Sequence, residues 1–93
     1  MKGFMYILKC CDGTYYTGST TNLKERLNQH LLGMGANYTK ERLPLKLVYF
    51  EEFQNIEYAF MREKQVQNWS QLKKEALIQG NTEELKRLSR SKK

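Results

Sequence analysis

Five side chains are of types that suit chemistry at a phosphate group: Tyr6, Tyr16, Arg26, His30 and Glu63. A guanidinium binds phosphate oxygens through a planar fork of N–H donors. A carboxylate on an apolar helix face is costly unless it is paired or binds a metal ion. A tyrosine hydroxyl, with a pKa of about 10, is a proton donor at neutral pH unless nearby cations stabilise its phenolate. Each residue alone also has an ordinary packing or surface explanation, so the elements that carry them must bring them together.

The two tyrosines lie on the strands of a predicted hairpin, Phe4 to Cys10 and Tyr15 to Ser19, joined at the turn signal Asp12-Gly13. A two-residue loop would pair Lys9 with Tyr16 and send the two tyrosines to opposite faces of the sheet. A three-residue loop with a left-handed Gly13 would pair Leu8 with Tyr16 and put both tyrosines on one face. The sequence permits either register.

A helix is predicted after Asn22, which can cap it together with Glu25 three residues later. Its apolar stripe is formed by Leu23, Leu27 and Leu31. Arg26 and His30 are four residues apart and lie at the edge of that stripe. From this edge both side chains could reach across the sheet toward the tyrosines, although a solvated helix edge would look the same.

Gly18 ends the second strand just before that helix. A glycine at such a position lets another group approach the backbone closely. The sequence therefore predicts a phosphate approach at Gly18, with an ordinary turn glycine as the alternative.

Glu63 interrupts the apolar face of a second helix, formed by Ile56, Ala59, Phe60 and Val66. It lies one turn from Ala59 and close in azimuth to Phe60, so it falls within this face. A pair with an arginine at the edge of the core is the structural explanation for such a carboxylate. Binding of a metal ion is the functional one.

The remaining elements complete a small mixed domain. A third strand, Lys46 to Phe53, follows an irregular loop over residues 34 to 45, and two more helices begin after Ser70 and Thr82. The predicted order is β-β-α-β-α-α-α. We therefore expect an α+β fold in which helices pack on a three-stranded, mostly antiparallel sheet.

Length and charge bound the classes of function. The 93 residues predict a single domain over 1–93, with a core of about 3–80 and a basic C-terminal helix and tail over 81–93. The formal net charge of +6 favours polyanionic partners such as nucleic acid. No apolar run approaches the roughly 20 residues of a membrane span, and the N-terminus lacks a signal-peptide pattern. These observations predict a cytoplasmic protein without a membrane partner.

The order and spacing of the motifs resemble the GIY-YIG nuclease superfamily, above all its small standalone bacterial members. The resemblance is carried by Phe4-Met5-Tyr6, by Tyr16-Thr17-Gly18 after ten residues, by Thr21 to Leu27 (TNLKERL), and by Glu63 in AFMRE. It covers roughly residues 3 to 80. The triplets alone are loose motifs, whereas YTGSTTNLKERLNQH together with the downstream glutamate is specific.

The resemblance implies a role for each of the five residues. Tyr16 would accept the proton of an attacking water, and Tyr6 would help to hold that water or the phosphate. Arg26 would bind the phosphate, and His30 would orient the site or relay the proton. Glu63 would hold one divalent metal ion, Mg²⁺ or Mn²⁺. A site shared by both tyrosines requires the three-residue hairpin loop, which we therefore predict.

Two departures from the family pattern bear on these roles. The first triplet lacks its glycine and isoleucine, and Ser19 stands where the DNA-repair branch carries a lysine that helps to activate the tyrosine. The proton acceptor therefore stays open between Tyr16 and His30. The implied function is a metal-dependent endonuclease that acts on nucleic acid, with DNA favoured over RNA and the choice between them left open by the sequence. The alternatives are a catalytically weak domain that binds nucleic acid and a protein-interaction module.

Overall fold

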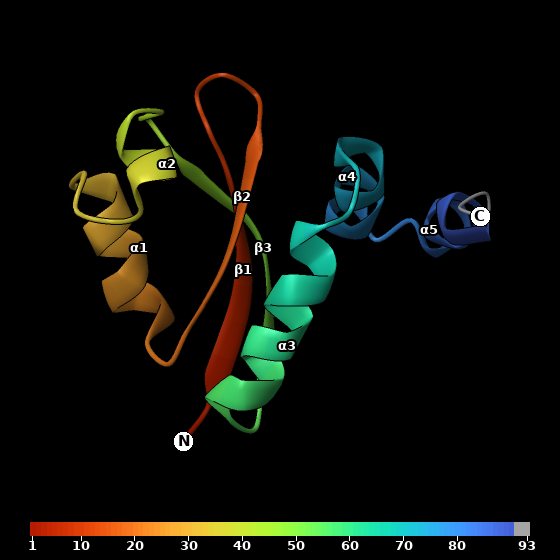
Figure 1. The fold of residues 1–93 in the computed structure, drawn as a ribbon, viewed down its shortest axis with the longest axis horizontal. Coiled ribbons are helices and arrows are strands. Elements are labelled where there is room, and N and C mark those ends of the chain that lie inside the picture. The colour runs from red at the N-terminus through yellow and green to blue at the C-terminus, as the bar shows by residue number, and fades with distance from the viewer. Residues whose placement is uncertain (91–93) are drawn as a thin grey trace.

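Three antiparallel strands form the centre of the molecule in the computed structural model, which describes residues 1–90 (Figure 1). They are β1 (Gly3–Lys9), β2 (Tyr15–Thr20) and β3 (Lys46–Phe53), in the sheet order β2-β1-β3. The central strand β1 is buried on both faces because helices cover both. Its side chains alternate, so Met5 and Ile7 point to one face and Tyr6 and Leu8 to the other.

The helices follow the predicted order, with one short addition. They are α1 (Leu23–Leu31), α2 (Asn37–Lys40), α3 (Ile56–Gln67), α4 (Gln71–Gln79) and α5 (Thr82–Arg90). The addition is α2, a single turn of helix inside the segment 34–45 that the sequence predicts as an irregular loop. No helix within residues 1–90 is long and apolar enough to cross a membrane.

Two apolar clusters hold the helices to the sheet. On one face, Met5 and Ile7 pack with Val66 of α3 and Leu77 of α4. The other face has Tyr6, Leu8, Cys10 and Leu45, covered by Leu23 and Leu27 of α1. Figure 1 shows α1 and α2 on one side of the sheet and α3 on the other. The predicted α+β fold with a three-stranded antiparallel sheet is confirmed.

Two details of the predicted helix faces are wrong. Leu31, placed on the apolar stripe of α1, is 47% exposed, and His30 takes the inward position instead. The stripe is therefore Leu23, Leu27 and His30, which follow the helical spacing i, i+4, i+7. On α3 the buried residues Ala59, Glu63 and Val66 show the same spacing, whereas Phe60 lies outward with Lys64 Nζ 4.9 Å from its ring.

The predicted basic helix and tail over 81–93 is described only in part. Helix α5 runs to Arg90 and packs through Leu85 against the cluster around Leu77. Residues 91–93 of the predicted tail lie outside the described residues.

Candidate active site

The hairpin between β1 and β2 has the bulged three-residue loop that a shared site requires. Tyr6 pairs with Gly18 and Leu8 pairs with Tyr16. The turn is closed by a hydrogen bond from the Gly13 N–H to the Cys10 carbonyl of 3.0 Å, and Gly13 is left-handed with φ 85°. Both tyrosine rings therefore lie on the face covered by α1, with centroids 6.5 Å apart.

His30 lies at the centre of this face rather than at the helix edge. Its side chain is 0% exposed, and its Nε2 lies 2.9 Å from the Tyr6 hydroxyl. Its ring centroid is 5.7 Å from that of Tyr6 and 5.4 Å from that of Tyr16. A Cβ on Gly35 would lie 2.2 Å from His30 Nδ1, so only glycine leaves room for the ring there. The structure thus brings three of the predicted site residues into direct contact.

Thr39 determines which nitrogen of His30 carries the proton. The Thr39 hydroxyl donates to the Ala36 carbonyl at 3.0 Å, and His30 Nδ1 lies 2.9 Å from the same oxygen. Since that hydroxyl proton is already used, Thr39 accepts from an Nδ1–H. Nε2 is then the unprotonated nitrogen and accepts from the Tyr6 hydroxyl.

The protonation equilibrium of His30 agrees with this assignment. Burial, aided by the positive charge of Arg26, lowers the pKa of His30 from 6.5 to about 4. The imidazole is therefore neutral at pH 7, with one donor and one acceptor nitrogen. The buried imidazole therefore accepts the hydrogen bond of the Tyr6 hydroxyl as an oriented neutral base.

Arg26 lies close enough to both tyrosine hydroxyls to affect their ionisation. Burial raises the pKa of Tyr6 and of Tyr16, and the guanidinium of Arg26 opposes this effect on both. Arg26 Nη1 also donates to Gln29 Oε1 at 3.0 Å, one turn along α1. The cation therefore stands where it can meet an anion placed against the two hydroxyls.

Glu63 lies on α3, which packs on the other face of the sheet, and contacts β2 at Ser19. It is 9% exposed, and its Oε1 accepts from Ser19 Oγ at 2.5 Å. Burial is the main cause of the raised pKa of Tyr6 and of Tyr16, and the negative charge of Glu63 adds to it in both. The predicted structural alternative, an arginine partner, is not found among the side chains of residues 1–89: the cation beside Glu63 is Lys64, at 3.8 Å and itself 54% exposed.

The residues present fit a metal ion that is shared with a substrate. Within the described part of the chain, no three His, Cys, Asp or Glu side chains come together. The protein therefore offers a single carboxylate, that of Glu63. Mg²⁺ and Mn²⁺ accept carboxylate, water and phosphate oxygens and are often held by one or two carboxylates plus substrate phosphates. Such a site would be weak until a phosphate supplies the remaining ligands.

Gly18 has a packing reason to be glycine. A Cβ at this position would lie 2.5 Å from the Tyr6 hydroxyl oxygen. Because Gly18 has no side chain, the Tyr6 hydroxyl can lie directly against the backbone of β2. The predicted approach of a phosphate at Gly18 stays a prediction.

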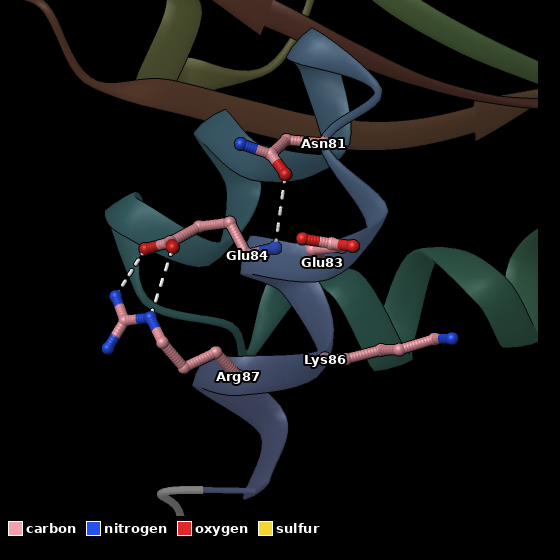
Figure 2. A pocket seen from close by; sticks show the side chains of 5 residues that line it. All are labelled: Asn81, Glu83, Glu84, Lys86 and Arg87. Atoms are coloured by element: carbon pink, nitrogen blue, oxygen red, sulfur yellow. Dashed lines mark hydrogen bonds and ion pairs between the residues drawn. The ribbon is translucent and has the colours of Figure 1, made fainter.

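Some hollows of the described surface carry none of the five predicted residues. Figure 2 shows one of about 540 Å³ beside α5, lined by Asn81, Glu83, Glu84, Lys86 and Arg87. Three of these residues are engaged with one another: Arg87 Nε donates to Glu84 at 3.0 Å, and Asn81 accepts from the Glu84 N–H at 3.1 Å. This hollow is formed by residues at the start of α5, and it is not a candidate active site.

The sequence did not indicate Thr39 or Gly35. Both lie in the segment predicted as a loop, and no periodicity links them to His30. Ser19 was noted only as a departure from the family pattern, and its bond to Glu63 could not be foreseen. A threonine that contacts a helix residue nine positions earlier has no sequence signature.

Comparisons with known proteins identify the family. The model of the GIY-YIG catalytic domain matches residues 2–76. A UPF0213 protein of Streptococcus agalactiae is 51% identical over 63 residues, which is 68% of this chain and 72% of that protein. A UPF0213 protein of Natronomonas pharaonis is 42% identical over 79 residues, covering 85% of this chain and 93% of that protein.

Two solved structures share the fold. The solution structure of a UPF0213 protein from Bacillus halodurans has a TM-score of 0.55 and 42% identity, covering 85% of this chain and 84% of that chain. The solution structure of a protein from E. faecalis has a TM-score of 0.59 and 28% identity, covering 88% of each chain. Because the family model spans most of the chain and the motif residues meet around one strand, this protein belongs to the GIY-YIG catalytic domain family.

Proposed function

We propose that this protein is a metal-dependent endonuclease that hydrolyses phosphodiester bonds in nucleic acid, in DNA ahead of RNA. The observation that carries the proposal is the buried hydrogen-bond chain from Tyr6 through His30 to Thr39, beside Arg26. The side chains of this hydrogen-bond chain are all buried, and they hold a neutral base against a tyrosine hydroxyl. This arrangement suits the removal of a proton from water at a phosphate.

The proton acceptor that the geometry favours is Tyr6 acting together with His30. As a water oxygen attacks phosphorus, one water proton passes to the Tyr6 oxygen while the Tyr6 proton passes to His30 Nε2. The bond from phosphorus to the leaving ester oxygen breaks, and that oxygen takes up the electron pair and a proton from solvent. Tyr6 is never a free phenolate, which its raised pKa would disfavour.

His30 has to become more basic when the substrate is bound. Its pKa of about 4 without ligand reflects burial and the nearby Arg26 cation. A phosphodiester placed against Arg26 would pair with that cation and add a negative charge, and both effects favour the imidazolium. Proton transfer is thereby linked to the presence of substrate.

Arg26, Tyr16 and Glu63 would complete the site. The Arg26 guanidinium would hold the non-bridging phosphate oxygens, and Tyr16, half-buried beside it, would donate its hydroxyl to the phosphate or to the attacking water. Glu63 would hold the metal ion together with phosphate and water oxygens. When bound, the cation would neutralise charge that develops on the phosphate and on the leaving oxygen.

A second candidate is a domain that binds nucleic acid without cutting it. The observation in its favour is that Glu63 Oε1 already has a partner in Ser19 at 2.5 Å. Ser19 also brings no positive charge to the position that follows Gly18. In this case the basic protein would bind phosphates, and the buried chain would be a remnant.

A cleavage panel distinguishes the two candidates. Labelled DNA and RNA of one sequence, each as single strand, duplex and branched junction, are incubated with Mg²⁺, with Mn²⁺ and with EDTA. The nuclease proposal expects cutting that needs metal and disappears in Glu63→Gln protein purified in the same way, which controls for contaminating nucleases. Binding of these substrates without any metal-dependent cutting would favour the second candidate.

A further inference from the structure

A second hollow adjoins the candidate active site along the outer edge of the sheet. It has a volume of about 290 Å³ and is lined by Tyr15, Tyr16, Thr17, Tyr38, Gln67 and Lys74. Strand β2 is an edge strand, since β1 is the only strand within residues 1–90 that pairs with it. The hollow therefore lies over the part of β2 just before Gly18, and Tyr16 belongs to both the hollow and the active site.

Lys74 is the cation of this hollow, and the described part of the chain offers it no counter-ion. Its side chain is half-buried, and no acid among residues 1–90 is within ion-pair distance of its ammonium group. The adjacent acid, Glu75, instead accepts from the Tyr15 hydroxyl at 3.3 Å. Burial lowers the pKa of Lys74, which an anion bound in the hollow would reverse. A partly desolvated ammonium without a partner is a binding position for an anion.

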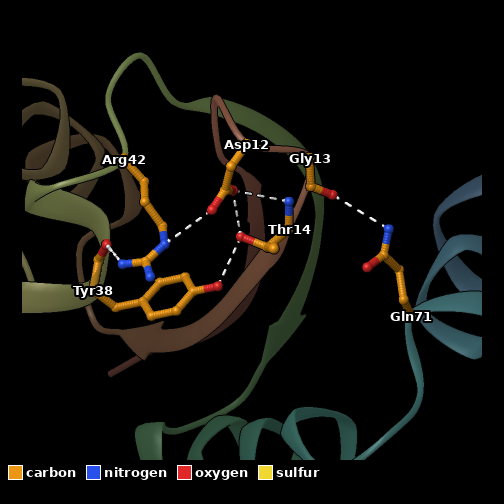
Figure 3. A network of polar contacts seen from close by, with 6 residues as sticks. All are labelled: Asp12, Gly13, Thr14, Tyr38, Arg42 and Gln71. Carbon is orange, nitrogen blue, oxygen red and sulfur yellow. Dashed lines mark hydrogen bonds and ion pairs between the residues drawn. The ribbon is translucent and has the colours of Figure 1, made fainter.

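The wall that carries Tyr38 is held to the hairpin turn by a polar network, shown in Figure 3. The Tyr38 hydroxyl donates to Thr14 Oγ1 at 2.7 Å, and Thr14 donates in turn to Asp12 at 2.7 Å. Arg42 pairs with Asp12 at 3.1 Å and lies over the Tyr38 ring at 3.8 Å from its centroid. The ring also stacks on Tyr16, with centroids 6.2 Å apart. Tyr38 is therefore held in place, and its ring already packs against Arg42 and Tyr16, so it is not available to stack on a base.

The opposite wall is held to the same turn. Gln71, at the start of α4, donates its side-chain amide to the Gly13 carbonyl at 3.3 Å (Figure 3). Lys74 lies three residues further along α4, on nearly the same side of the helix. Both walls of the hollow thus depend on the hairpin turn, which sets their separation before any ligand binds.

Lys74 would bind a different anion from the phosphate that Arg26 would hold in the active site. Lys74 lines the hollow over β2, whereas Arg26 and Glu63 do not. Tyr16 lines this hollow too, so an anion on Lys74 would lie beside the active site rather than in it. Two neighbouring phosphates of one nucleic-acid strand would occupy two such adjacent positions, one at Arg26 and one at Lys74.

We propose that the hollow over β2 binds the nucleotide next to the cleaved bond, with the backbone phosphate of that nucleotide on Lys74. The proposal rests on the proposed function, because it takes its position from the phosphate held by Arg26. It implies that the strand runs along the edge of β2. Contacts to phosphate and sugar carry no base information, so this subsite adds affinity without adding sequence preference.

The test compares Lys74→Met with Lys73→Met, because each removes one charge and keeps an apolar stem. Lys73 is a matched control: its ammonium lies 4.2 Å from the centroid of the Trp69 ring, and it does not line the hollow. Binding of a fluorescent single-stranded DNA is measured in EDTA over a range of salt. Lys74→Met should lower the slope of log affinity against log salt by about 1, whereas Lys73→Met should leave it unchanged. Lys74→Arg should retain the wild-type slope.

A second readout locates the contact. One phosphate at a time is replaced in the DNA by an uncharged methylphosphonate. With the wild-type protein, a replacement adjacent to the cut should weaken binding; with Lys74→Met, the same replacement should have no further effect. Equal behaviour of Lys74→Met and Lys73→Met, or identical scans for wild type and Lys74→Met, would overturn the subsite. If the predicted pattern appears but no metal supports cutting, the subsite stands as a phosphate site and the nuclease proposal fails.

Discussion

The Tyr6 hydroxyl lies 2.9 Å from Nε2 of His30, and neither side chain is more than 2% exposed. This pair joins the central strand to the first helix through polar atoms in the middle of an apolar cluster. Such a bond is sensitive to any change in either partner, because a buried donor or acceptor without a partner costs about 1–3 kcal/mol.

Tyr6→Phe should reduce cleavage by about 100- to 10,000-fold, the usual contribution of a positioned proton acceptor. It should also destabilise the protein by about 1–3 kcal/mol, because His30 Nε2 loses its donor. The matched control is Tyr49→Phe, which removes a hydroxyl bonded to Glu51 at 2.5 Å, away from the site. Turnover and urea unfolding are measured on the same preparations. If Tyr16→Phe abolishes cleavage while Tyr6→Phe does not, Tyr16 is the acceptor and the assignment made here is wrong.

The folding stability should depend on the protonation of His30, which is the one histidine of the chain. The pKa of His30 is lowered from 6.5 to about 4 in the folded protein, so between these values the unfolded chain binds more protons. Stability should therefore rise with pH from about 4 to 6.5 and be flat above that, with a total change on the order of 3 kcal/mol. Urea unfolding at a series of pH values measures the change, and an NMR titration of the imidazole measures the pKa itself. His30→Gln should lose this part of the pH dependence, and an imidazole that titrates near 6.5 in the folded protein would contradict the prediction.

Thr39→Val should lower turnover by about 10- to 100-fold, the size expected when a group that orients a functional histidine is removed. The substitution keeps the shape of the side chain but removes the acceptor for the Nδ1–H of His30. The distribution of the two imidazole tautomers, read from ¹⁵N chemical shifts, should change with it, whereas the affinity for uncut DNA should not. Thr39→Ser should restore both turnover and the wild-type tautomer. A loss of stability in Thr39→Val without any change in tautomer would point to packing alone.

Glu63→Gln should keep the fold, since its amide oxygen can still accept from Ser19, but should lower metal-dependent cleavage by orders of magnitude. Loss of the negative charge removes the ligand that a hard cation prefers. Glu57→Gln makes the same chemical change on the exposed first turn of the same helix and serves as the control. Melting temperature, turnover and DNA binding in EDTA are compared for the two variants. A folded Glu63→Gln protein that cuts at the wild-type rate would exclude the metal role.

The sequence predicted most of the elements but not the centre of the site. Periodicity placed Glu63 on the buried face of α3, and the strand patterns placed both tyrosines on one hairpin. The register of that hairpin was open from local signals alone, because a turn at Asp12-Gly13 fits two loop lengths. It was decided only by requiring the tyrosines to share a face, and the structure confirms the longer loop.

The burial of His30 could not be predicted because it depends on a small rotation of α1. Leu23, Leu27 and Leu31 predict an apolar stripe that ends at Leu31. In the structure the inward position of the last turn is taken by the preceding residue, His30. The deciding factor is the chain after the helix, where Gly35 and Thr39 fold back over the imidazole and give it a polar partner. A polar residue enters the core when a distant residue satisfies it, and a sequence window around the helix does not contain that residue.

The hydrogen-bond chain from Tyr6 through His30 and Thr39 ends at the backbone carbonyl of Ala36. A carbonyl accepts a hydrogen bond but does not take up a proton at neutral pH. A proton that enters at Tyr6 therefore cannot leave at the far end, and it has to return by the route on which it came. For a nuclease of this design, each catalytic cycle includes a recovery step, in which His30 releases its proton through Tyr6 to the product or to incoming water. At high substrate concentration, that return can limit the rate, and it would appear as a solvent isotope effect on turnover rather than on the first cut.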